Sequence, residues 1–372
     1  MKTPLCHSLG IEMPIFAFSH CRDVVAEVTK AGGMGVLGIS GFTAEQLAQE
    51  LDWLDAHTGG RPYGVDLLMP NNYQDVGAKK LDRDAILPKD VVEFMNRKLD
   101  EAGIARLPED QRDAMLRAED EHTNVGTSEA AKLFDVALQH TQVKLVVSAL
   151  GTPSRHFVDL AHQHGVLVGS LVGKVEHALA QKEAGVDLLI AQGMEAGGHT
   201  GSITSMVLWP QIVDAVAPMP VLAAGGIGRG RQMAAALALG AEGVWCGSIW
   251  LGTRESELEP ELKQRLFDAA SEDAIQTKAH SGKTMRALRS KYSEIWNQPG
   301  APKPLPMPLQ FILNHESTLR IKRARATDWM FYPVGQIVGD MGHETSVRQV
   351  VQGMLEEYLE SVERLQVLTS GE

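Results

Sequence analysis

The sequence of 372 residues has few cysteines, few aromatic residues and no long uncharged apolar run. Its three cysteines, Cys6, Cys21 and Cys246, are an odd number without Cys-x-x-Cys spacing. We therefore expect a reducing compartment, with neither a disulfide framework nor a metal site. No stretch of about 18 uncharged apolar residues could cross a membrane, and the first residues lack the apolar core of a signal peptide. These absences predict a cytoplasmic protein without a membrane partner.

The charge balance argues against a nucleic-acid partner. Lysine and arginine number 35 against 47 aspartates and glutamates, which gives a formal net charge of -12, and a negative chain repels polyanions. A Gly-x-Gly-x-x-Gly motif after the first strand, a Walker phosphate loop and a His-Glu-x-x-His motif are also absent. The sequence therefore gives little support to a dinucleotide-binding Rossmann fold, although its 44% hydrophobic content suffices for a sizeable core.

Apolar strand-like runs alternate with helical patterns along most of the chain. The hydrophobic period switches repeatedly from that of a strand to that of a helix, as it does in β-α units. Eight such units favour a closed parallel barrel, the TIM (β/α)8 fold, over an open doubly wound sheet. The expected strands are 15–18, 34–38, 63–68, 145–149, 167–171, 188–192, 220–224 and 243–246.

We expect a barrel domain over residues 1–272 and a C-terminal extension over 273–372 that packs on it. Residues 70–126, after the third strand, are too many for a simple loop and carry a charged helical pattern, so they predict a helical insertion that could act as a lid. Residues 297–308 are rich in proline and predict a segment that wraps the surface. A last helix is expected over 346–365.

The most informative motif is Gly-Met-Glu-Ala-Gly-Gly-His, residues 193–199, directly after an expected strand. Barrel enzymes keep their chemistry at the carboxyl ends of the strands. Gly197 and Gly198 allow backbone amides to approach a ligand closely. The imidazole of His199 titrates near neutral pH and can move a proton on that ligand. We therefore expect His199 to be a catalytic base.

Glycines also follow the last two expected strands. Gly225 and Gly226 come after the seventh strand, and Gly247 with Ser248 comes after the eighth. Barrels commonly bind a phosphate at these two loops. The backbone amides there could cradle a phosphate dianion, with Arg229 as an available countercharge.

Four segments together carry a family resemblance: an early Gly-Gly turn at 32–38, the histidine motif at 191–201, the phosphate segment at 220–256 and a late Gly-Gln within 334–336. They resemble the nitronate monooxygenase family, also called 2-nitropropane dioxygenase-like, whose members are flavin mononucleotide (FMN) proteins. The similarity covers most of residues 10–345.

The resemblance implies that FMN lies over the carboxyl mouth of the barrel. It implies an oxidoreductase in which His199 takes the proton from the carbon beside a nitro group or holds a nitronate. Dioxygen then receives the electrons, and a carbonyl compound and nitrite are formed. The cofactor-binding residues that it indicates are Ala17, Asp66, Gln192, Gly197, Gly198, Gly225, Gly226, Gly247, Ser248 and Gln336.

Two departures from the family pattern fall beside the expected flavin ring. Many members have Gln-Ala-Pro-Met after the first strand, whereas this chain has Phe-Ala-Phe-Ser-His at 16–20. Asp66 stands where members usually have Asn, which exchanges an amide donor for an acceptor-only carboxylate if Asp66 is ionised. Asn71 and Asn72 follow shortly and could supply the missing amide.

Some features stay open to more than one interpretation. His20 and His280 are weaker candidates for the barrel mouth. Residues 278–286, with a Ser-Gly followed by basic residues, could contact a phosphate or a carrier-bound acyl substrate, but a solvated charged loop is favoured. The chain is compatible with a homo-oligomer.

Three functions remain at this point. The preferred one is a nitronate monooxygenase that acts on a small molecule with FMN and dioxygen. The second is an FMN-dependent NAD(P)H oxidoreductase that reduces a quinone or an enoyl thioester, because relatives with the same histidine motif include enoyl-acyl-carrier-protein reductases. The third is a non-catalytic flavin-binding protein.

Overall fold

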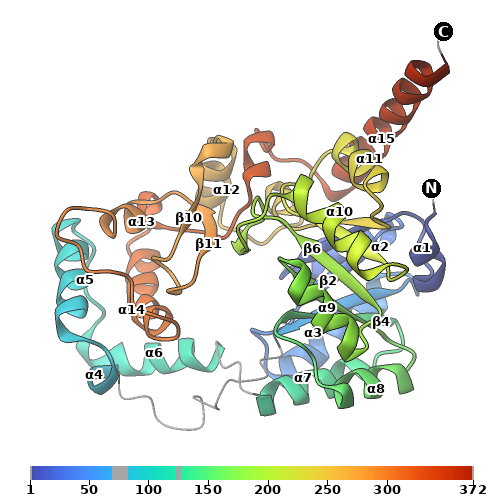
Figure 1. Cartoon of the computed structure of the whole chain (residues 1–372). Coiled ribbons are helices and arrows are strands. Elements are labelled where there is room, and N and C mark those ends of the chain that lie inside the picture. Colours follow the sequence, from blue (N-terminus) through green and yellow to red (C-terminus); the bar gives the residue numbers. More distant parts are fainter. Residues whose placement is uncertain (1, 69–82, 123–126, 371–372) are drawn as a thin grey trace.

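The computed structural model describes residues 2–68, 83–122 and 127–370, and its centre is a closed barrel of eight parallel strands (Figure 1). The last strand pairs with the first, so that Ala17 lies opposite Cys246. The expected TIM barrel is confirmed. The barrel strands are β1 (Ile15–Ser19), β2 (Met34–Gly38), β3 (Tyr63–Leu68), β4 (Val143–Leu150), β5 (Leu167–Val172), β6 (Leu188–Gln192), β8 (Val221–Ala224) and β9 (Gly243–Cys246).

Helices between the strands cover the outside of the barrel, and their ends carry recognisable capping residues. Thr43 and Gln46 form a capping box at the start of one helix, and the Ser154 hydroxyl accepts the Phe157 N–H at the start of another. These helices are α2 (Arg22–Lys30), α3 (Ala44–His57), α7 (Thr127–Leu138), α8 (Arg155–Gln163), α9 (Val175–Ala184), α10 (Ser205–Val216) and α11 (Gly230–Ala238).

Side chains pack the interior of the barrel, so that ligands cannot pass through it. Inward-facing side chains such as Phe16, Met34 and Leu145 fill it. The short helix α1 (Pro4–Leu9), which the sequence patterns did not predict, adds Leu5 and Leu9 to the same cluster. The amino-terminal end of the barrel is therefore covered, and ligands have access to the carboxyl end.

Two distant parts of the chain fold together into a small lobe beside the barrel (Figure 1). Phe94 and Leu99 from the first part share a buried cluster with Tyr292, Trp296 and Leu313 from the second. The described part of the expected insertion is thus helical, and it packs on the C-terminal extension. The domain boundaries remain predictions. The helices of the small lobe are α4 (Arg83–Ile86), α5 (Lys89–Glu101), α6 (Glu109–His122), α13 (Lys291–Ile295) and α14 (Leu309–Arg323).

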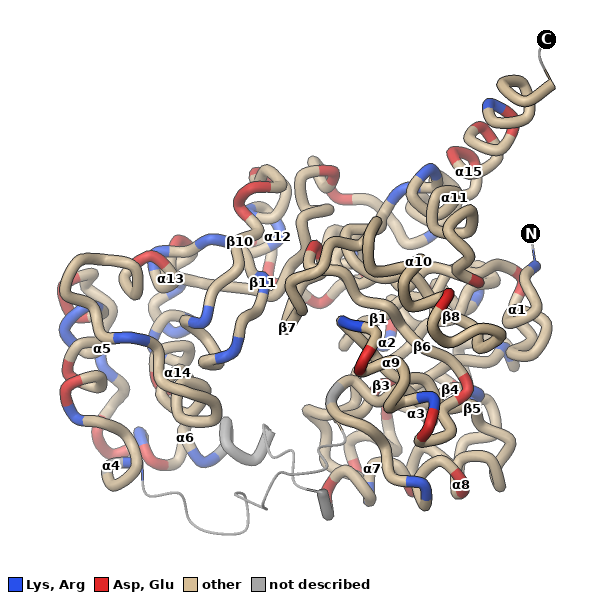
Figure 2. The backbone as a smooth tube through the Cα atoms, in the orientation of Figure 1, with Lys and Arg blue, Asp and Glu red and all other residues tan. Residues whose placement is uncertain are grey.

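Ion pairs join the two halves of the small lobe, where acidic and basic residues alternate along α5 and α6 (Figure 2). Arg112 contacts Glu316 at 2.6 Å. Arg320, fully buried on α14, contacts Asp100 at 2.6 Å and also donates to the Ile104 carbonyl. A buried guanidinium with this many acceptors is satisfied, so it fixes α14 against α5.

A second, three-stranded sheet lies between the barrel and the small lobe. It consists of β10 (Ala274–Thr277), β11 (Met285–Leu288) and β7 (Gly198–His199), in the antiparallel order β10-β11-β7. Met285 lies opposite His199. The histidine motif is therefore part of this sheet, although it follows directly on barrel strand β6.

The end of the chain returns to the barrel. After α12 (Pro260–Phe267) and the short 3-10 helices η2 (Ser248–Gly252), η3 (Ser271–Asp273), η4 (Thr327–Trp329) and η5 (Gln336–Asp340), the long helix α15 (Val347–Ser370) packs on α11 and α2. The predicted last helix is confirmed, and its far end projects from the body of the molecule (Figure 1). Within the described ranges, no helix is both long and apolar enough to cross a membrane.

His280 does not face the barrel mouth, so that prediction is wrong. The side chain is 2% exposed, inside the small lobe, and its ring stacks on Tyr292 and Phe331. Neither ring nitrogen has a hydrogen-bond partner in the described chain. Burial lowers the pKa of His280 well below its usual value, because the charged form would be desolvated without compensation.

This burial predicts a specific loss of stability in acid. Below about pH 6.5 the His280 imidazole is protonated in the unfolded chain but stays neutral in the folded chain. His280 therefore lowers the free energy of unfolding by up to about 1.4 kcal/mol for each pH unit of acidification. The difference between the urea midpoints at pH 7.5 and pH 5.5 should therefore be smaller in His280→Leu than in the wild type. His343→Gln, at an exposed histidine, should behave as the wild type does. An unchanged acid loss in His280→Leu would contradict the assignment.

Candidate functional site

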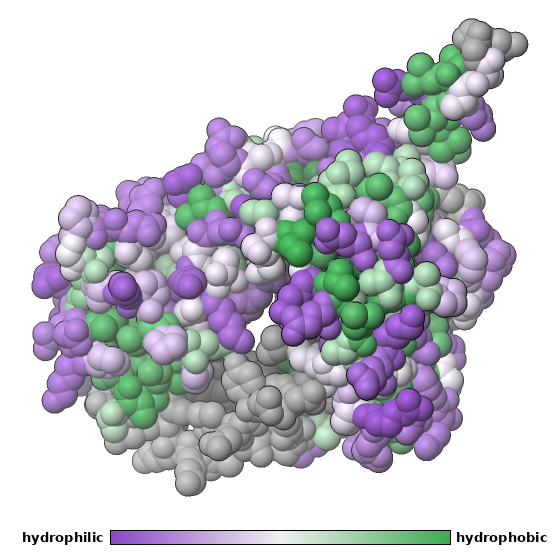
Figure 3. Space-filling model, in the orientation of Figure 1, coloured by the Kyte–Doolittle hydropathy of each residue, from purple (hydrophilic) through white to green (hydrophobic). Residues whose placement is uncertain are grey.

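The predicted site residues gather at the carboxyl end of the barrel. Ala17 and Asp66 lie on β1 and β3, and Gln192 is the last residue of β6. The glycines at 197–198, 225–226 and 247 follow β6, β8 and β9, and Gln336 begins η5. The space-filling view shows a hollow between the barrel and the small lobe (Figure 3).

The loops after β8 and β9 form a cradle of backbone amides. Gly225 and Gly226 have φ angles of 109° and 70°, which side-chain-bearing residues rarely adopt. Within the described chain, the N–H groups of Gly226, Gly247 and Ser248 donate to no protein acceptor. Unpaired amides at the carboxyl ends of two neighbouring strands can bind an anion, so the predicted phosphate loops have the required donors.

Arg229 is not the countercharge of this cradle. Its guanidinium binds Glu357 on α15 and lies 3.5 Å from Asp340. Glu357 also accepts the N–H of Gly230 at 3.0 Å, at the start of α11. The arginine and the N-terminus of α11 therefore bind α15, and the guanidinium is not available to neutralise an anion at the cradle.

The late Gly-Gln segment, residues 335–336, contacts both the loop of the histidine motif (193–199, the histidine loop) and the loop after β9 (247–248). The Gly335 N–H donates to the Ser248 hydroxyl at 2.7 Å, and the Gln336 N–H donates to the Glu195 carbonyl at 2.9 Å. A Cβ on Gly197 would lie 2.9 Å from the Gly335 nitrogen. Only glycine permits this approach, so three segments far apart in the sequence meet here.

A carboxylate that the sequence patterns did not indicate fixes the histidine loop. Glu195 accepts the N–H of Ser205 at 3.0 Å and its hydroxyl at 2.8 Å, at the start of α10. The Ser205 hydroxyl also donates to the Gly225 carbonyl at 3.0 Å. Glu195 lies inside the histidine motif, but no local pattern indicates that its partner is Ser205, ten residues later.

His199 has a buried hydroxyl as its partner. Its Nε2 lies 2.7 Å from the Oγ of Ser281, a side chain that is 2% exposed. Burial lowers the pKa of His199, and the nearby Lys283 ammonium lowers it further. The imidazole is therefore neutral at pH 7 and can accept a proton.

Residues 278–286 are a solvated charged loop only in part: Lys278 and Lys283 are exposed, but for the remainder that interpretation is wrong. His280 and Ser281 are buried, and the segment continues into β11. Arg286 is 5% exposed; it donates to the Met194 carbonyl at 2.8 Å and to the Ala274 carbonyl. The Arg286 guanidinium thus provides hydrogen-bond donors to backbone carbonyls that would otherwise be buried without a partner.

The departures from the family pattern lie together at the barrel mouth. Phe18 packs against Trp245 and against His20, whose Nδ1 lies 3.2 Å from the Gly38 carbonyl. Asp66 is 5% exposed, and burial raises its pKa to about 8. The carboxyl is thus neutral at pH 7. In this form it has an O–H donor, which the ionised form considered from the sequence would lack. Asn71 and Asn72 lie outside the described residues.

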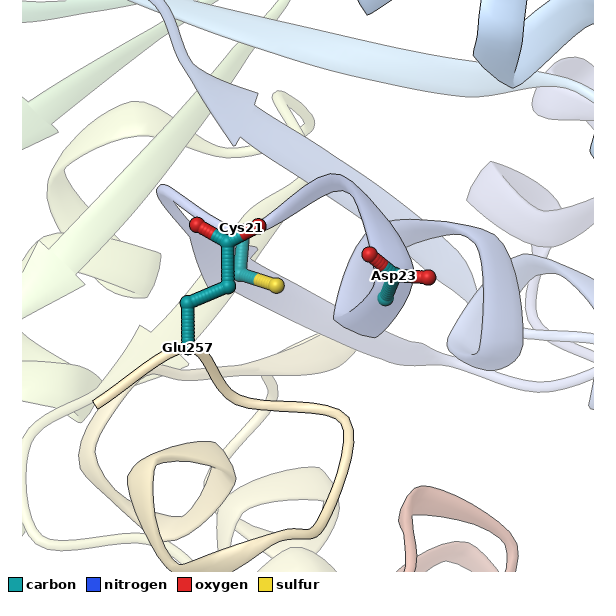
Figure 4. A group of neighbouring side chains, drawn as sticks. All are labelled: Cys21, Asp23 and Glu257. Atoms are coloured by element: carbon teal, nitrogen blue, oxygen red, sulfur yellow. The ribbon is translucent and has the colours of Figure 1, made fainter. Parts of the chain in front are cut away.

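Three further side chains come together at the start of α2 (Figure 4). Cys21, Asp23 and Glu257 bring one potential metal-ligand atom each within 4.8 Å of one another. The Cys21 thiol donates to the Glu255 carbonyl at 3.0 Å. Burial and the charges of Glu257 and Asp23 raise its pKa. A metal ligand must be the thiolate, so these surroundings oppose the state that a metal would need.

The fold and the site together define a class, the barrel enzymes that bind a phosphate-bearing cofactor at the last two strands. The family model described as Nitronate monooxygenase matches residues 3–357. The chain therefore belongs to the nitronate monooxygenase family and is a flavin-type oxidoreductase. This membership confirms the resemblance drawn from the sequence and leaves the non-catalytic interpretation without support.

Known proteins resemble the chain over nearly its full length. The "Putative monooxygenase Rv1533" of Mycobacterium tuberculosis is 45% identical over 379 residues, 99% of each chain. A nitroalkane oxidase from Streptomyces ansochromogenes has a similar structure, with a TM-score of 0.75 and 27% identity, over 98% of this chain and 100% of that one. FabK from Thermotoga maritima has a TM-score of 0.71 and 25% identity, over 98% and 99%.

The residues at the mouth fit a flavin that carries a phosphate. The cradle at Gly226, Gly247 and Ser248 offers free N–H donors for the phosphate. Gln192 and Asp66, at the ends of β6 and β3, are polar groups available to the ring.

The Gly247→Ala variant tests the cradle without disturbing the fold. An added Cβ would have Phe18 Cδ1 at 3.9 Å as its nearest neighbour, so the free energy of unfolding should stay unchanged. The methyl group would occupy the cradle and weaken flavin binding about tenfold, as followed by flavin fluorescence. Gly342→Ala, with nothing within 4 Å of its added Cβ, should bind flavin as the wild type does. Equal affinities in the two variants would exclude this cradle.

Proposed function

We propose that the protein is an FMN-dependent nitronate monooxygenase that oxidises alkyl nitronates with dioxygen to a carbonyl compound and nitrite. The observation that carries the proposal is the placement of His199, a neutral imidazole that Ser281 holds at the end of the loop whose Glu195 carbonyl accepts the Gln336 N–H. The similarity to a nitroalkane oxidase over the whole chain supports the same class of substrate.

The chain would hold FMN through two sets of groups. Gly225, Gly226, Gly247 and Ser248 would bind its phosphate, and Ala17, Asp66, Gln192, Gly197, Gly198 and Gln336 would line the remainder of the cofactor. When bound, FMN supplies the capacity to take electrons from the substrate and to react with dioxygen. The protein contributes binding, orientation and proton transfer.

The proton-accepting atom of His199 follows from the contacts of Ser281. The Ser281 hydroxyl lies 3.3 Å from the Lys283 carbonyl, to which it can donate. If its proton is used there, Nε2 of His199 carries the N–H that Ser281 accepts. The lone pair is then on Nδ1, which we assign as the base that takes the proton beside a nitro group.

The His199→Asn variant should separate proton removal from the later chemistry. With a neutral nitroalkane, turnover should fall about 10²–10⁴-fold, because general-base catalysis is lost. With a preformed nitronate, which has no such proton to lose, the decrease should be much smaller. Nitrite release measures both reactions, and flavin absorbance checks that the cofactor is retained. Wild-type turnover of the nitroalkane by this variant would defeat the assignment of the base.

The Ser281→Ala variant tests how the imidazole is positioned. In the wild type, the rate with a nitroalkane should fall as the pH drops below about 6.5, because His199 acts as a base only when neutral and its pKa is lowered. Loss of the Ser281 contact frees the ring to rotate, so kcat should drop about tenfold while flavin binding is retained. Ser281→Thr keeps the hydroxyl and should restore most of the rate. The assignment fails if the alanine variant keeps the wild-type kcat and pH profile.

The second candidate is an NAD(P)H oxidoreductase that acts on a quinone or an enoyl thioester. The histidine motif favours it, because this motif also resembles that of enoyl-acyl-carrier-protein reductases. Flavin absorbance without oxygen distinguishes the two. Bleaching by an alkyl nitronate alone supports the monooxygenase, whereas rapid bleaching by NADH or NADPH supports the reductase.

A further inference from the structure

Asp66 is the most unusual polar group at the barrel mouth. It lies near the carboxyl end of β3, opposite Gly38 of β2. Gly64, two residues earlier, faces the interior, since a Cβ there would contact Val36 and Leu145 of the interior cluster. Because side chains on a strand alternate between its two faces, Asp66 faces the interior as well.

The Asp66 carboxyl is buried without a protein partner. Its side chain is 5% exposed, and no side-chain hydrogen bond or ion pair of Asp66 exists within the described chain. Leaving a buried polar group unpaired costs about 1–3 kcal/mol, and more if the group is charged. The Asp66 oxygens are not among the fully enclosed unpaired atoms of the described chain, so a ligand at the mouth can reach them, and a neutral acid can offer that ligand an O–H.

Among the described residues, the neighbours of Asp66 on the adjacent strands carry little charge that could stabilise a carboxylate. On the neighbouring strand β2, Gly38 carries no side chain, and the ring of His20 lies over it. On β4, the opposing residue is Val147. The pKa of His20 is lowered by burial, so that ring is neutral too. Burial is the one resolved cause that raises the pKa of Asp66.

We propose that Asp66 is held as a neutral carboxylic acid and donates its O–H to an acceptor atom of the bound flavin ring. This inference rests on FMN binding as proposed above. It resolves the departure from the family pattern, because a protonated carboxyl restores the donor that an asparagine amide would provide. It also adds a property that an amide lacks, since the donor is lost when the acid ionises near pH 8.

The absorbance of bound FMN between pH 6.5 and 9.5 tests the inference without turnover. In the wild type, the spectrum should change with one transition near pH 8, and FMN affinity should fall about tenfold across it. Asp66→Asn should keep the low-pH spectrum and affinity throughout, because its amide donor does not titrate in this range. Asp214→Asn, at an exposed carboxyl on α10, should reproduce the wild-type transition.

The outcomes separate this inference from the proposed function. A protein that binds no FMN overturns both. Bound FMN without a transition near pH 8, or with the same transition in Asp66→Asn, overturns the role of Asp66 alone. Bleaching by nitronate would still support the monooxygenase in that case.

The stability of the flavin-free protein gives a second measurement. A carboxyl whose pKa is higher in the folded chain than in the unfolded chain contributes stability that is present at low pH. That contribution is lost as the pH rises from about 4 toward 8. Asp66→Asn should therefore raise the urea midpoint more at pH 8 than at pH 5. An equal effect at both values would show that Asp66 is not held neutral.

Discussion

The antiparallel pairing of β7 with β11 is the contact on which the geometry of the site depends. It places His199 opposite Met285 and leads the chain from Ser281 into the sheet. Arg286 reinforces it by donating to the Met194 carbonyl. The histidine loop is therefore connected to the barrel through β6 and to the small lobe through its pairing with β11. A change in the relative position of the two lobes would move His199 with respect to the amide cradle.

The barrel and the positions of its loops could be predicted because they depend on local patterns. Alternating periods locate the strands, and glycines such as Gly226 and Gly247 mark the loops where a barrel binds a phosphate. The partner of His199 could not be predicted in this way. Ser281 is 82 residues away, and nothing in its own neighbourhood indicates that it is buried. The small lobe was missed for the same reason, since its two halves share a core only after folding.

The errors have a common physical cause. Arg229, His280 and residues 278–286 were interpreted from side-chain chemistry, as a countercharge, a mouth histidine and a solvated loop. In the structure, burial or a distant partner determines the role of each. Arg229 pairs with Glu357, 128 residues later, and Arg286 pairs with backbone carbonyls. A charged residue in a sequence indicates a group that needs a partner, but the fold decides whether that partner is solvent, ligand or protein.

Several of the described groups at the mouth of the barrel are neutral donors and acceptors, although the chain carries a net charge of -12. Burial lowers the pKa of His199 and raises that of Asp66, while Arg229 is engaged by α15. Backbone amides, an imidazole and a carboxylic acid remain. Such groups bind a ligand that brings its own negative charge without repelling it, as a phosphate or a nitronate would require. The Lys283 ammonium near His199 has the sign to favour the same ligands, and it keeps the imidazole in the form that accepts a proton. Binding an anion and retaining a base are therefore compatible demands on this site, because the Lys283 ammonium attracts an anion and also favours the neutral form of the imidazole.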